Sequence, residues 1–540
     1  MNGTLACVSV TAATAASCIA EMEQAASLGA DVVEIRIDYM FPSPVLFAGE
    51  LDVAKQVVQY VVGNRPRGTP CIVTNRAAWE GGNSTLSEED RLALLIHAEA
   101  AGAEFVDVEL KAIETYLPMR ATMDKRAALI VSYHDFQKNL SKDELSEVYA
   151  RMCRAGADVA KIAMMCESVS QTFDLFDLLA ASPPLKTAAL GMGPHGQISR
   201  ILAPKFGAFV SFCSLLSGKE SAPGQLAIAE LKGMYRFGRL GRESKLYGVI
   251  GNAVQHSKSP LVHNAGFDRL GVDACYVPVL IKSDDQLTLK DVVQRGSQYG
   301  FRGFSVTIPH KENVMSLMDE MDDVARQIGA MNTVVIRPDG SKKGYNTDWT
   351  AAMDAIEQAA GAAGAGSLQG KRVLVIGAGG AGKALAYGAI ARGAHSVFIT
   401  NRTMSRAHQL VSDILPFAST HKCSVAAIDV TDKGSASSST STADVDVIIN
   451  STSVGMSPNA DETPLDASLL RAGMIVFDSV YAPLETRFLR EAKNCGCTVV
   501  SGLEMFVGQA VLQFILWNPE LESHADQLRN LMRNAILSAR

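Results

Sequence analysis

No stretch of this chain is apolar over the roughly 20 residues that a membrane-spanning helix needs, so no membrane contact is expected. The chain also lacks an excess of basic residues, since 57 acidic residues outnumber 50 basic ones and the net charge is −7. Nucleic-acid binding requires a basic face, and no nucleic-acid partner is expected. With 47% hydrophobic and 20% charged residues, the composition is that of a soluble globular protein.

Metal-ligand spacing is missing too. The ten cysteines are scattered, and only Cys495 and Cys497 lie close together. No histidine or second cysteine pair follows them at the spacing of a zinc site. We therefore expect no metal and interpret the cysteines as small buried residues in a reducing compartment.

The first residues enter a strand-like pattern and show neither a signal peptide nor an Arg/Ser-rich transit segment. A cytoplasmic protein is expected, unless a targeting segment is absent from this version of the sequence.

A length of 540 residues is too great for one ordinary core and predicts two or three domains. In the first 235 residues, short β-rich runs alternate with stretches of helical periodicity, such as 86–101 and 142–155. The β-rich runs cover 5–10, 31–38, 71–76, 105–110, 128–134, 159–163, 187–192 and 210–215. Eight such units match the size of a closed (β/α)8 barrel, with an open doubly wound sheet as the alternative.

Chemistry in such a barrel is expected at the C-terminal ends of the strands. Glu34, Arg36 and Asp38 alternate on one face of the second run, because strand side chains repeat with a period of two. Further polar residues lie within or after the later runs: Arg76, Glu80, His134, Lys161, Arg200, Ser221 and Gln225. Charges inside a barrel are costly unless they are paired, and one structural salt bridge does not account for so many.

Lys161 lies inside the sixth run, VAKIA, and apolar neighbours are expected around its amine. Desolvation favours a neutral amine, which attacks ketones to give a Schiff base. His134 can move protons near neutral pH, and Glu80 can fix its orientation. Arg200 suits a bidentate grip on a carboxylate. Such a set describes a keto acid that is activated as an iminium, loses an adjacent proton and then loses a leaving group.

In order from residue 31 to 225, the segments EIRID, WEGG after Arg76, SYHDF, AKIA, MGPHGQISR and SAPGQ resemble a type I 3-dehydroquinate dehydratase. The resemblance implies that Lys161 forms an imine with the C3 ketone of the substrate. It implies that His134 removes the C2 proton and assists loss of the C1 hydroxyl, and that Glu80 positions His134. Arg200 would hold the carboxylate, while the remaining residues would bind ring hydroxyls or shape the pocket: Glu34, Arg36, Arg76, Ser221 and Gln225.

A basic connector follows at 235–245, and its three arginines and two glycines predict an exposed link between two halves. Beyond it, residues 371–403 carry the clearest single motif, in which a strand, the loop GAGGAG at 377–382, a helix and a second strand follow one another. The loop fits G-x-G-x-x-G, whose glycines let the backbone approach a pyrophosphate at the helix N-terminus. This context predicts dinucleotide binding.

The second strand of this motif indicates which dinucleotide binds. It ends in Asn401, Arg402 and Thr403, whereas an NAD site places an acidic residue there to bind the ribose 2′-hydroxyl. Because Arg402 can pair with a 2′-phosphate, NADP is favoured over NAD.

Upstream lie two hydroxyls and a candidate acid–base pair. Ser257 and Ser259, in HSKSP, can bind a carboxylate, or they can cap a local turn. Lys311, in SVTIPHKE, and Asp348, in GYNTDW, are candidates to deliver a proton to the alkoxide that forms when a hydride reduces a ketone. A surface salt bridge between the two is the alternative.

Nearly all of 246–540 resembles shikimate dehydrogenase, through HSKSP, SVTIPHKE, GAMNT, YNTD, the glycine loop, NRT, NSTSVGM and GLEMFVGQ. By this resemblance Lys311 and Asp348 are catalytic. The implied substrate-binding residues are Ser257, Ser259, Thr307, Asn332, Asn346, Tyr481 and Gln509. The implied NADP-binding residues are Gly377, Gly379, Gly380, Ala381, Gly382, Asn401, Arg402 and Thr403.

Together the resemblances imply a fused α/β enzyme of the shikimate pathway. It would dehydrate 3-dehydroquinate to 3-dehydroshikimate and reduce this product to shikimate with NADPH. The expected division is a (β/α)8 TIM barrel at 1–235, a linker at 236–245, a substrate lobe at 246–360, a Rossmann NADP lobe at 361–501 and helices at 502–540 that return to the substrate lobe. The Ser/Thr-rich stretch 431–443 is expected to be a flexible surface loop.

The expected partners are these small molecules, and a monomer is expected. Such fusions are known in plants, so the plastid stroma is the expected location in a plant and the cytoplasm elsewhere. Quinate dehydrogenase is a rival for the second half, but its relatives tend to have glycine where this chain has Ser259 and Thr307. The other rival is a degenerate regulatory protein, against which the retention of every proposed catalytic group argues.

Overall fold

A computed structural model describes residues 3–41, 50–121, 123, 126–181, 185–364, 366–430 and 445–539. The chain divides into two compact units, one spanning 1–246, 253–260 and 271–300 and the other 247–252, 261–270 and 301–540. The stretch 431–443, which was expected to be a flexible loop, lies outside the described residues.

Eight parallel strands of the first unit form one sheet in the order β7-β6-β5-β4-β3-β2-β1-β8. They are β1 Leu5–Val10, β2 Val32–Arg36, β3 Cys71–Thr74, β4 Phe105–Glu109, β5 Ala128–Asp135, β6 Val159–Met165, β7 Lys186–Met192 and β8 Val210–Ser214. The end strands approach each other where the Phe209 amide donates to the Thr187 carbonyl at 2.8 Å. The expected barrel is therefore confirmed, in nearly closed form, and the strands do not follow the reversed order of an open doubly wound sheet.

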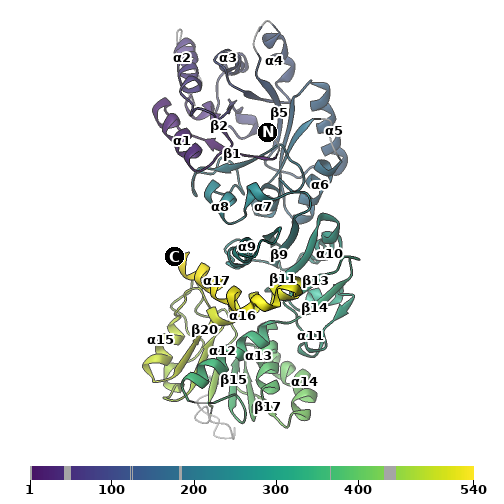
Figure 1. Ribbon diagram of the computed structural model, residues 1–540, viewed down its shortest axis with the longest axis vertical. Helices are drawn as coiled ribbons and strands as arrows, with labels where there is room; N and C mark the ends of the chain where they lie inside the picture. Colours follow the sequence, from purple (N-terminus) through teal and green to yellow (C-terminus); the bar gives the residue numbers. More distant parts are fainter. Residues whose placement is uncertain are drawn as a thin grey trace. The chain divides into compact units, whose positions relative to one another are not determined.

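Helices follow the strands in turn and surround the barrel (Figure 1). They are α1 Ala15–Ser27, α2 Glu50–Gly63, α3 Glu88–Ala100, α4 Ile113–Arg120, α5 Lys142–Arg154, α6 Val169–Ala180, α7 Gly193–Ile201 and α8 Ile228–Gly233. Local signals set their starts. Ser141 and Glu144 form a reciprocal capping box at the start of α5, and Ser87 accepts the Asp90 amide at the start of α3.

A second sheet has the order β10-β9-β11-β13-β14-β12. Its strands are β9 Lys245–Gly251, β10 Ala274–Leu280, β11 Phe301–Val306, β12 Glu320–Met321, β13 Thr333–Ile336 and β14 Lys342–Tyr345. The helices in this part of the chain are α9 Ser259–Arg269, α10 Gln286–Arg295 and α11 Asp323–Ile328. Strand β13 runs antiparallel to both of its neighbours, β11 and β14.

The third sheet is parallel, in the order β17-β16-β15-β18-β19-β20. Its strands are β15 Arg372–Ile376, β16 Ser396–Thr400, β17 Ser424–Ala427, β18 Val447–Asn450, β19 Ile475–Asp478 and β20 Thr498–Ser501, with helices α12 Asp348–Ala362, α13 Gly380–Ala391, α14 Met404–Thr420 and α15 Arg487–Asn494. Successive residues of β15 enter two different apolar cores: Val373 and Val375 one, Leu374 and Ile376 the other. A strand buried on both faces reads as a continuous apolar run, and here it forms the expected Rossmann sheet.

Of the last helices, α16 Gly502–Trp517 lies against β11 and β13, and α17 Ala525–Ser538 packs on α16 (Figure 1). On α16, Gln513 donates to the carbonyl of Asn332 at 3.1 Å, and the indole of Trp517 donates to the carbonyl of Val334 at 3.0 Å. Both side chains are buried, so these bonds satisfy polar groups that would otherwise be costly.

The connector at 235–245 differs from the exposed link that was expected. Tyr235 and Phe237 are buried, and so is Ser244, although Arg239 and Arg242 are exposed. The arginines and glycines of this segment suggest exposure, but its two aromatic rings are covered by the neighbouring structure.

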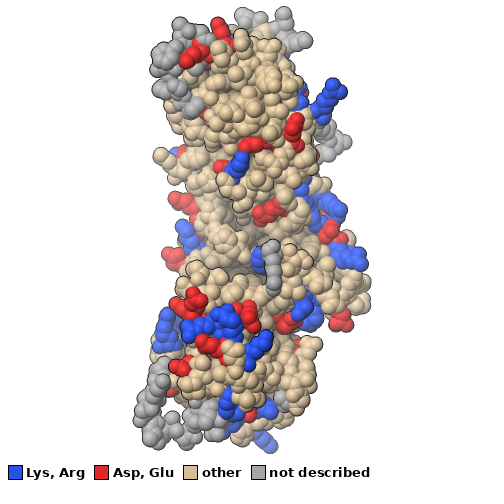
Figure 2. Space-filling model, turned by 90° about the vertical axis from the view of Figure 1, so that its left-hand side faces the viewer, with Lys and Arg blue, Asp and Glu red and all other residues tan. Residues whose placement is uncertain are grey.

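Within the described ranges, no helix combines the length and apolarity needed to cross a bilayer, and no cluster of three or more His, Cys, Asp or Glu side chains is arranged to hold a metal ion. All ten cysteines are free thiols. On the face shown in Figure 2, acidic and basic side chains lie interspersed.

Candidate active sites

A pocket of about 430 Å³, its open mouth included, lies in the barrel. All nine barrel residues to which the sequence assigned a role line it: Glu34, Arg36, Arg76, Glu80, His134, Lys161, Arg200, Ser221 and Gln225. Phe136, Met192 and Phe212 are among the apolar residues that complete the wall. Most of the polar residues come from strand ends or from the loops that follow them, as the barrel predicts.

The amine of Lys161 does not have the apolar surroundings that were expected. Its Nζ lies 2.8 Å from Oδ2 of Asp107 and 3.3 Å from Oε1 of Glu34, and it sits 3.9 Å from the centroid of the Phe212 ring. The neighbours of Lys161 in sequence are apolar, but side chains on a strand alternate between its two faces. The residues that face the amine across the barrel are two carboxylates and one aromatic ring.

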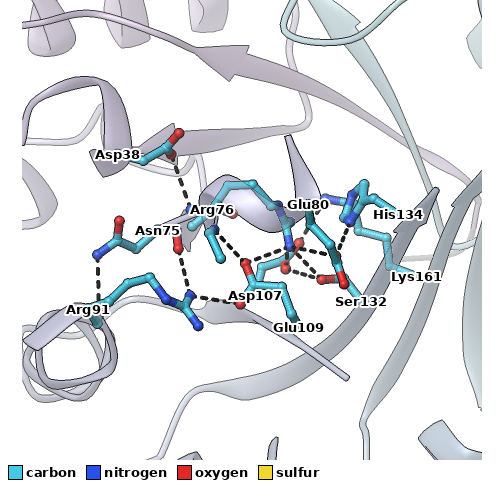
Figure 3. Close-up of polar contacts among 12 residues, drawn as sticks. Asp38, Asn75, Arg76, Glu80, Arg91, Asp107, Glu109, Ser132, His134 and Lys161 are labelled. Carbon is cyan, nitrogen blue, oxygen red and sulfur yellow. Dashed lines mark hydrogen bonds and ion pairs between the residues drawn. The ribbon is translucent and has the colours of Figure 1, made fainter. Parts of the chain in front are cut away.

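A buried ion network supports this amine (Figure 3). Asp107 also accepts from Arg76 at 2.8 Å and from the Ser132 hydroxyl at 2.6 Å through Oδ1. Arg76 pairs in addition with Glu109 at 3.1 Å, and Glu109 pairs with Arg91 at 2.7 Å. All these side chains are buried. Because desolvated charges are costly unless paired, each ion here depends on its neighbours.

The sequence patterns did not identify four members of this buried network: Asp107, Glu109, Ser132 and Arg91. The signal was present: in PheValAspValGluLeu at 105–110, Asp107 and Glu109 alternate with apolar residues, as Glu34 and Arg36 do in the second strand. Applying the same period to the fourth run would have placed both carboxylates inside the barrel.

Glu80 and His134 form a second pair, with Oε2 of Glu80 2.9 Å from Nδ1 of His134. Burial lowers the pKa of His134 well below its usual value, and the charges of Arg76 and Lys161 act in the same direction. Burial raises the pKa of Glu80 to about 8, against the opposing charge of Arg76. At neutral pH the two groups therefore hold one proton between them, and the imidazole is neutral.

Arg200, on α7, is almost fully buried in the pocket wall. It donates to the carbonyl of Phe212 at 3.3 Å, and in the described part of the chain no carboxylate lies within ion-pair distance of it. Burial lowers the pKa of Arg200 to about 10. A desolvated guanidinium that lacks an acidic partner is suited to a substrate carboxylate.

The other pocket residues are held by local bonds. Arg36 makes a bidentate pair with the buried Asp38, at 2.9 and 2.8 Å. Asp38 also accepts the backbone amide of Asn83, and so ties the end of β2 to the loop that carries Glu80. Ser221 and Gln225 hydrogen-bond to each other through their side chains at 3.0 Å.

In the second unit, Nζ of Lys311 lies 2.5 Å from Oδ2 of Asp348, and both side chains are largely buried. The amide of Asn332 donates to Oδ1 of the same carboxylate at 2.9 Å. Asn346 donates to the carbonyl of Ala330 at 2.8 Å and accepts the Asp348 amide at 3.0 Å. Asp348 begins α12 and is held on three sides, so this pair is not the exposed salt bridge considered as the alternative.

The remaining predicted substrate-binding residues make fewer contacts with the Lys311–Asp348 pair or with one another. Thr307 directly follows β11, and the ring of Tyr481 packs on Phe506 with centroids 4.4 Å apart. Gln509, on α16, has its backbone carbonyl 3.4 Å from the Thr347 hydroxyl, next to Asp348 in the chain. Ser257 accepts the amide of Ser259, which begins α9. These two serines belong to the first compact unit, and their place in a site with Lys311 stays a prediction.

The glycine loop joins β15 to α13, as the motif predicts. Gly377 has φ = +112°, a conformation that other residues rarely adopt, and Gly379 caps α13 without a side chain. A Cβ on Gly380 would lie 3.1 Å from the Cβ of Lys311, so the loop and the Lys311–Asp348 pair are in direct contact. After β16, Asn401 accepts the Ala378 amide at 3.3 Å, and Arg402 and Thr403 are exposed.

These features fit a dinucleotide. The amides at the start of α13 are open to a pyrophosphate, and Gly379 would have nothing within 4 Å of an added Cβ. The exposed Arg402 follows β16, at the position where a protein of this fold binds the 2′-phosphate of NADP.

Comparison with known proteins assigns three family models to successive parts of the chain. Residues 6–241 match the family Type I 3-dehydroquinase, residues 249–334 the Shikimate dehydrogenase substrate binding domain, and residues 358–464 the family Shikimate / quinate 5-dehydrogenase. A barrel that carries a lyase site is thus joined to a two-lobed dinucleotide-dependent dehydrogenase.

Among curated relatives, the bifunctional 3-dehydroquinate dehydratase/shikimate dehydrogenase, chloroplastic, of Arabidopsis thaliana is 38% identical over 523 residues, which are 95% of this chain and 82% of the relative. The shikimate dehydrogenase (NADP(+)) of Bacillus cereus (strain AH187) is 38% identical over 273 residues, or 51% of this chain and 92% of the relative. The chain therefore belongs to the family of bifunctional 3-dehydroquinate dehydratase/shikimate dehydrogenases.

Two solved structures are similar as well. The shikimate 5-dehydrogenase of Thermus thermophilus, crystallised with NADP(H) and shikimate, has 32% identity and a TM-score of 0.44, covering 54% of this chain and 99% of its own. The dehydroquinate dehydratase and shikimate dehydrogenase from S. pombe has 24% identity and a TM-score of 0.41, covering 98% of both chains.

The proton shared by Glu80 and His134 makes the barrel activity sensitive to pH. When Glu80 ionises, at a pH of about 8, Nδ1–H of His134 must donate to its carboxylate, which leaves Nε2 free to act as a base. We expect kcat/KM for dehydration to rise as the pH passes about 8. In Glu80→Gln this inflection disappears, and shikimate oxidation in the same samples serves as the control. An unchanged inflection in Glu80→Gln would rule out the shared proton as its source.

Proposed function

We propose that the barrel of this bifunctional enzyme dehydrates 3-dehydroquinate through a Schiff base on Lys161. The observation that carries the proposal is the placement of one amine, one neutral imidazole and one guanidinium without an acidic partner in a single pocket: Lys161, His134 and Arg200. A carbonyl that condenses with the amine becomes an electron sink, which makes the adjacent C–H bond acidic.

The roles of the pocket residues follow from their contacts. Arg200 receives the substrate carboxylate, which supplies the acidic partner that its guanidinium lacks. His134 is neutral and takes the proton next to the iminium carbon, and the same proton then leaves with the hydroxyl as water. Glu80 fixes the imidazole through Nδ1. Arg76 is paired with carboxylates of the chain itself, so it shapes the pocket by holding Asp107 beside Lys161.

For the second half we propose NADPH-dependent reduction of 3-dehydroshikimate to shikimate. The contact between the glycine loop and Lys311 carries this proposal, because it places the dinucleotide-binding turn beside a buried acid–base pair. Gly377, Gly379 and Gly382 let a pyrophosphate approach the start of α13, and Arg402 would pair with a 2′-phosphate. When bound, NADPH supplies the hydride. Lys311, held by Asp348, donates a proton to the developing alkoxide.

The finer assignments rest on the residues present. Ser259 and Thr307 favour shikimate over the bulkier quinate, and we propose shikimate as the preferred product. The boundaries 1–235, 246–360, 361–501 and 502–540 are proposed as the functional divisions. The Arabidopsis relative is described as chloroplastic, and we propose a plastid stroma for this chain if its source is a plant.

The Schiff base can be trapped. Wild-type protein treated with 3-dehydroquinate and borohydride should gain the mass of the reduced substrate on the peptide that contains Lys161. Lys161→Ala should lose both the adduct and dehydration, yet keep NADPH-dependent reduction of 3-dehydroshikimate. Lys311→Ala is the matched control, since it should keep the adduct. A wild-type protein that dehydrates without acquiring an adduct would refute the imine.

Removal of the carboxylate that holds Lys311 tests the second site. In Asp348→Asn we expect kcat for reduction to fall by roughly 10²- to 10⁴-fold, the usual contribution of a positioned acid or base. Glu312→Gln is the control, because it removes a surface ion pair with Lys383 next to the site and should leave kcat unchanged. Equal losses in the two variants would show that Asp348 is only structural.

Cofactor choice depends on Arg402. Loss of one charge-assisted contact to phosphate, worth about 1.5–3 kcal/mol, should raise the KM for NADPH about ten- to a hundredfold in Arg402→Ala. The KM for NADH should stay the same, because NADH has no 2′-phosphate. Lys493→Ala, an exposed cation on α15 of the same lobe, is the matched control. An equal rise for both cofactors would contradict recognition of the 2′-phosphate.

A further inference from the structure

Asp107 makes the shortest polar contact with Nζ of Lys161, although it belongs to none of the quoted motifs and is not among the residues that line the pocket. It is fully buried on β4, and its Oδ2 lies 2.8 Å from Nζ of Lys161, nearer than the 3.3 Å of Glu34. We propose that Asp107 is a catalytic residue of the barrel: the permanent counter-ion of the Lys161 nitrogen, which accepts its hydrogen bond in both the ammonium and the iminium. This inference rests on the proposed Schiff base.

The balance of the reaction defines what such a counter-ion must do. Condensation converts R–NH₃⁺ and a ketone into R–NH⁺=C and water, so two hydrogens of the nitrogen leave with the ketone oxygen. The nitrogen carries one positive charge before and after, but three N–H bonds become one. A carboxylate facing it therefore stays ionised at both ends of the step and need not keep a proton.

The distances favour Asp107 over Glu34 as the acceptor of the one N–H bond that the iminium nitrogen retains. In the free enzyme Nζ donates to Asp107 and Glu34 and lies over the Phe212 ring. With one N–H left, the shorter contact, to Asp107, persists. Since an iminium is planar, that single bond fixes the rotation of the C=N plane relative to His134. Glu34 then loses the contact with Lys161 but keeps the hydroxyl donors of Ser9 and Thr74.

The surroundings keep Asp107 in its ionised form and in place. Its other oxygen accepts from Arg76 and Ser132, which prevents the side chain from rotating away (Figure 3). The cations Arg76 and Lys161 hold its pKa below the usual range of an aspartate despite full burial. An anion that two fixed donors orient is a pre-organised electrostatic partner for a developing cation.

Asp107→Asn tests the proposal, because it keeps the shape of the side chain and removes the charge. We expect kcat for dehydration and the rate of borohydride-trapped adduct formation each to fall on the order of a hundredfold, the loss typical of one pre-organised electrostatic contact. KM should change little, since Arg200 is untouched. Shikimate dehydrogenase activity of the same samples reports that the remainder of the chain is folded.

Glu109→Gln is the matched control. Glu109 belongs to the same buried network through Arg76 and Arg91 but makes no contact with Lys161, so this variant should keep adduct formation within a few fold of wild type. If Asp107→Asn forms the adduct at the wild-type rate, or if both variants lose it equally, Asp107 is not the counter-ion. A wild-type protein without adduct would instead defeat the Schiff base itself.

Loss of a buried charge can unfold the barrel, and Asp107→Glu guards against that outcome. It keeps the negative charge beside Arg76 while moving the carboxylate by about one methylene. A folded Asp107→Glu protein, checked by its circular dichroism, should show a tenfold or greater loss of adduct rate. Wild-type adduct formation in this variant would overturn the proposal.

Discussion

The ion pair between Lys161 and Asp107 is the interaction on which the barrel site depends. An amine held between carboxylates inside a β-barrel is costly to desolvate, and it persists because Arg76 and the Ser132 hydroxyl in turn donate to Asp107. The network fixes the position of the amine in the pocket that it shares with His134, and burial together with the cations Arg76 and Lys161 favours the neutral imidazole. The same buried charges therefore hold Lys161 in place and favour the neutral form of His134.

The second site applies the same principle with fewer charges. Asp348, the partner of Lys311, is held by the side chains of Asn332 and Asn346, and the glycine loop lies directly against Lys311. A side chain at Gly380 would push the lysine away, so the absence of one lets the glycine loop pack against Lys311, the proposed acid. In the proposed mechanisms each half uses a lysine, the first as a nucleophile through its nitrogen and the second as a proton donor.

Much of this could be predicted from the sequence, because strand runs and motifs are local signals. The eight runs fall within a few residues of the observed strands, and all nine predicted barrel residues line one pocket. The carboxylates around Lys161 could not be predicted from local patterns, because Asp107 and Glu34 contact it from two other strands, β4 and β2. The burial of Tyr235 and Phe237 in the connector likewise depends on packing that no local pattern reports.

We propose that two separate sites in this chain carry out consecutive reactions on one carbon skeleton. The most direct measurement supplies 3-dehydroquinate and NADPH together and identifies the product by mass spectrometry while NADPH absorbance is followed. We expect shikimate, with one NADPH consumed per molecule formed. In Lys161→Ala we expect no shikimate until 3-dehydroshikimate is added. Shikimate formation from 3-dehydroquinate by Lys161→Ala, or a wild-type reaction that stops at 3-dehydroshikimate with NADPH unused, would contradict the proposal.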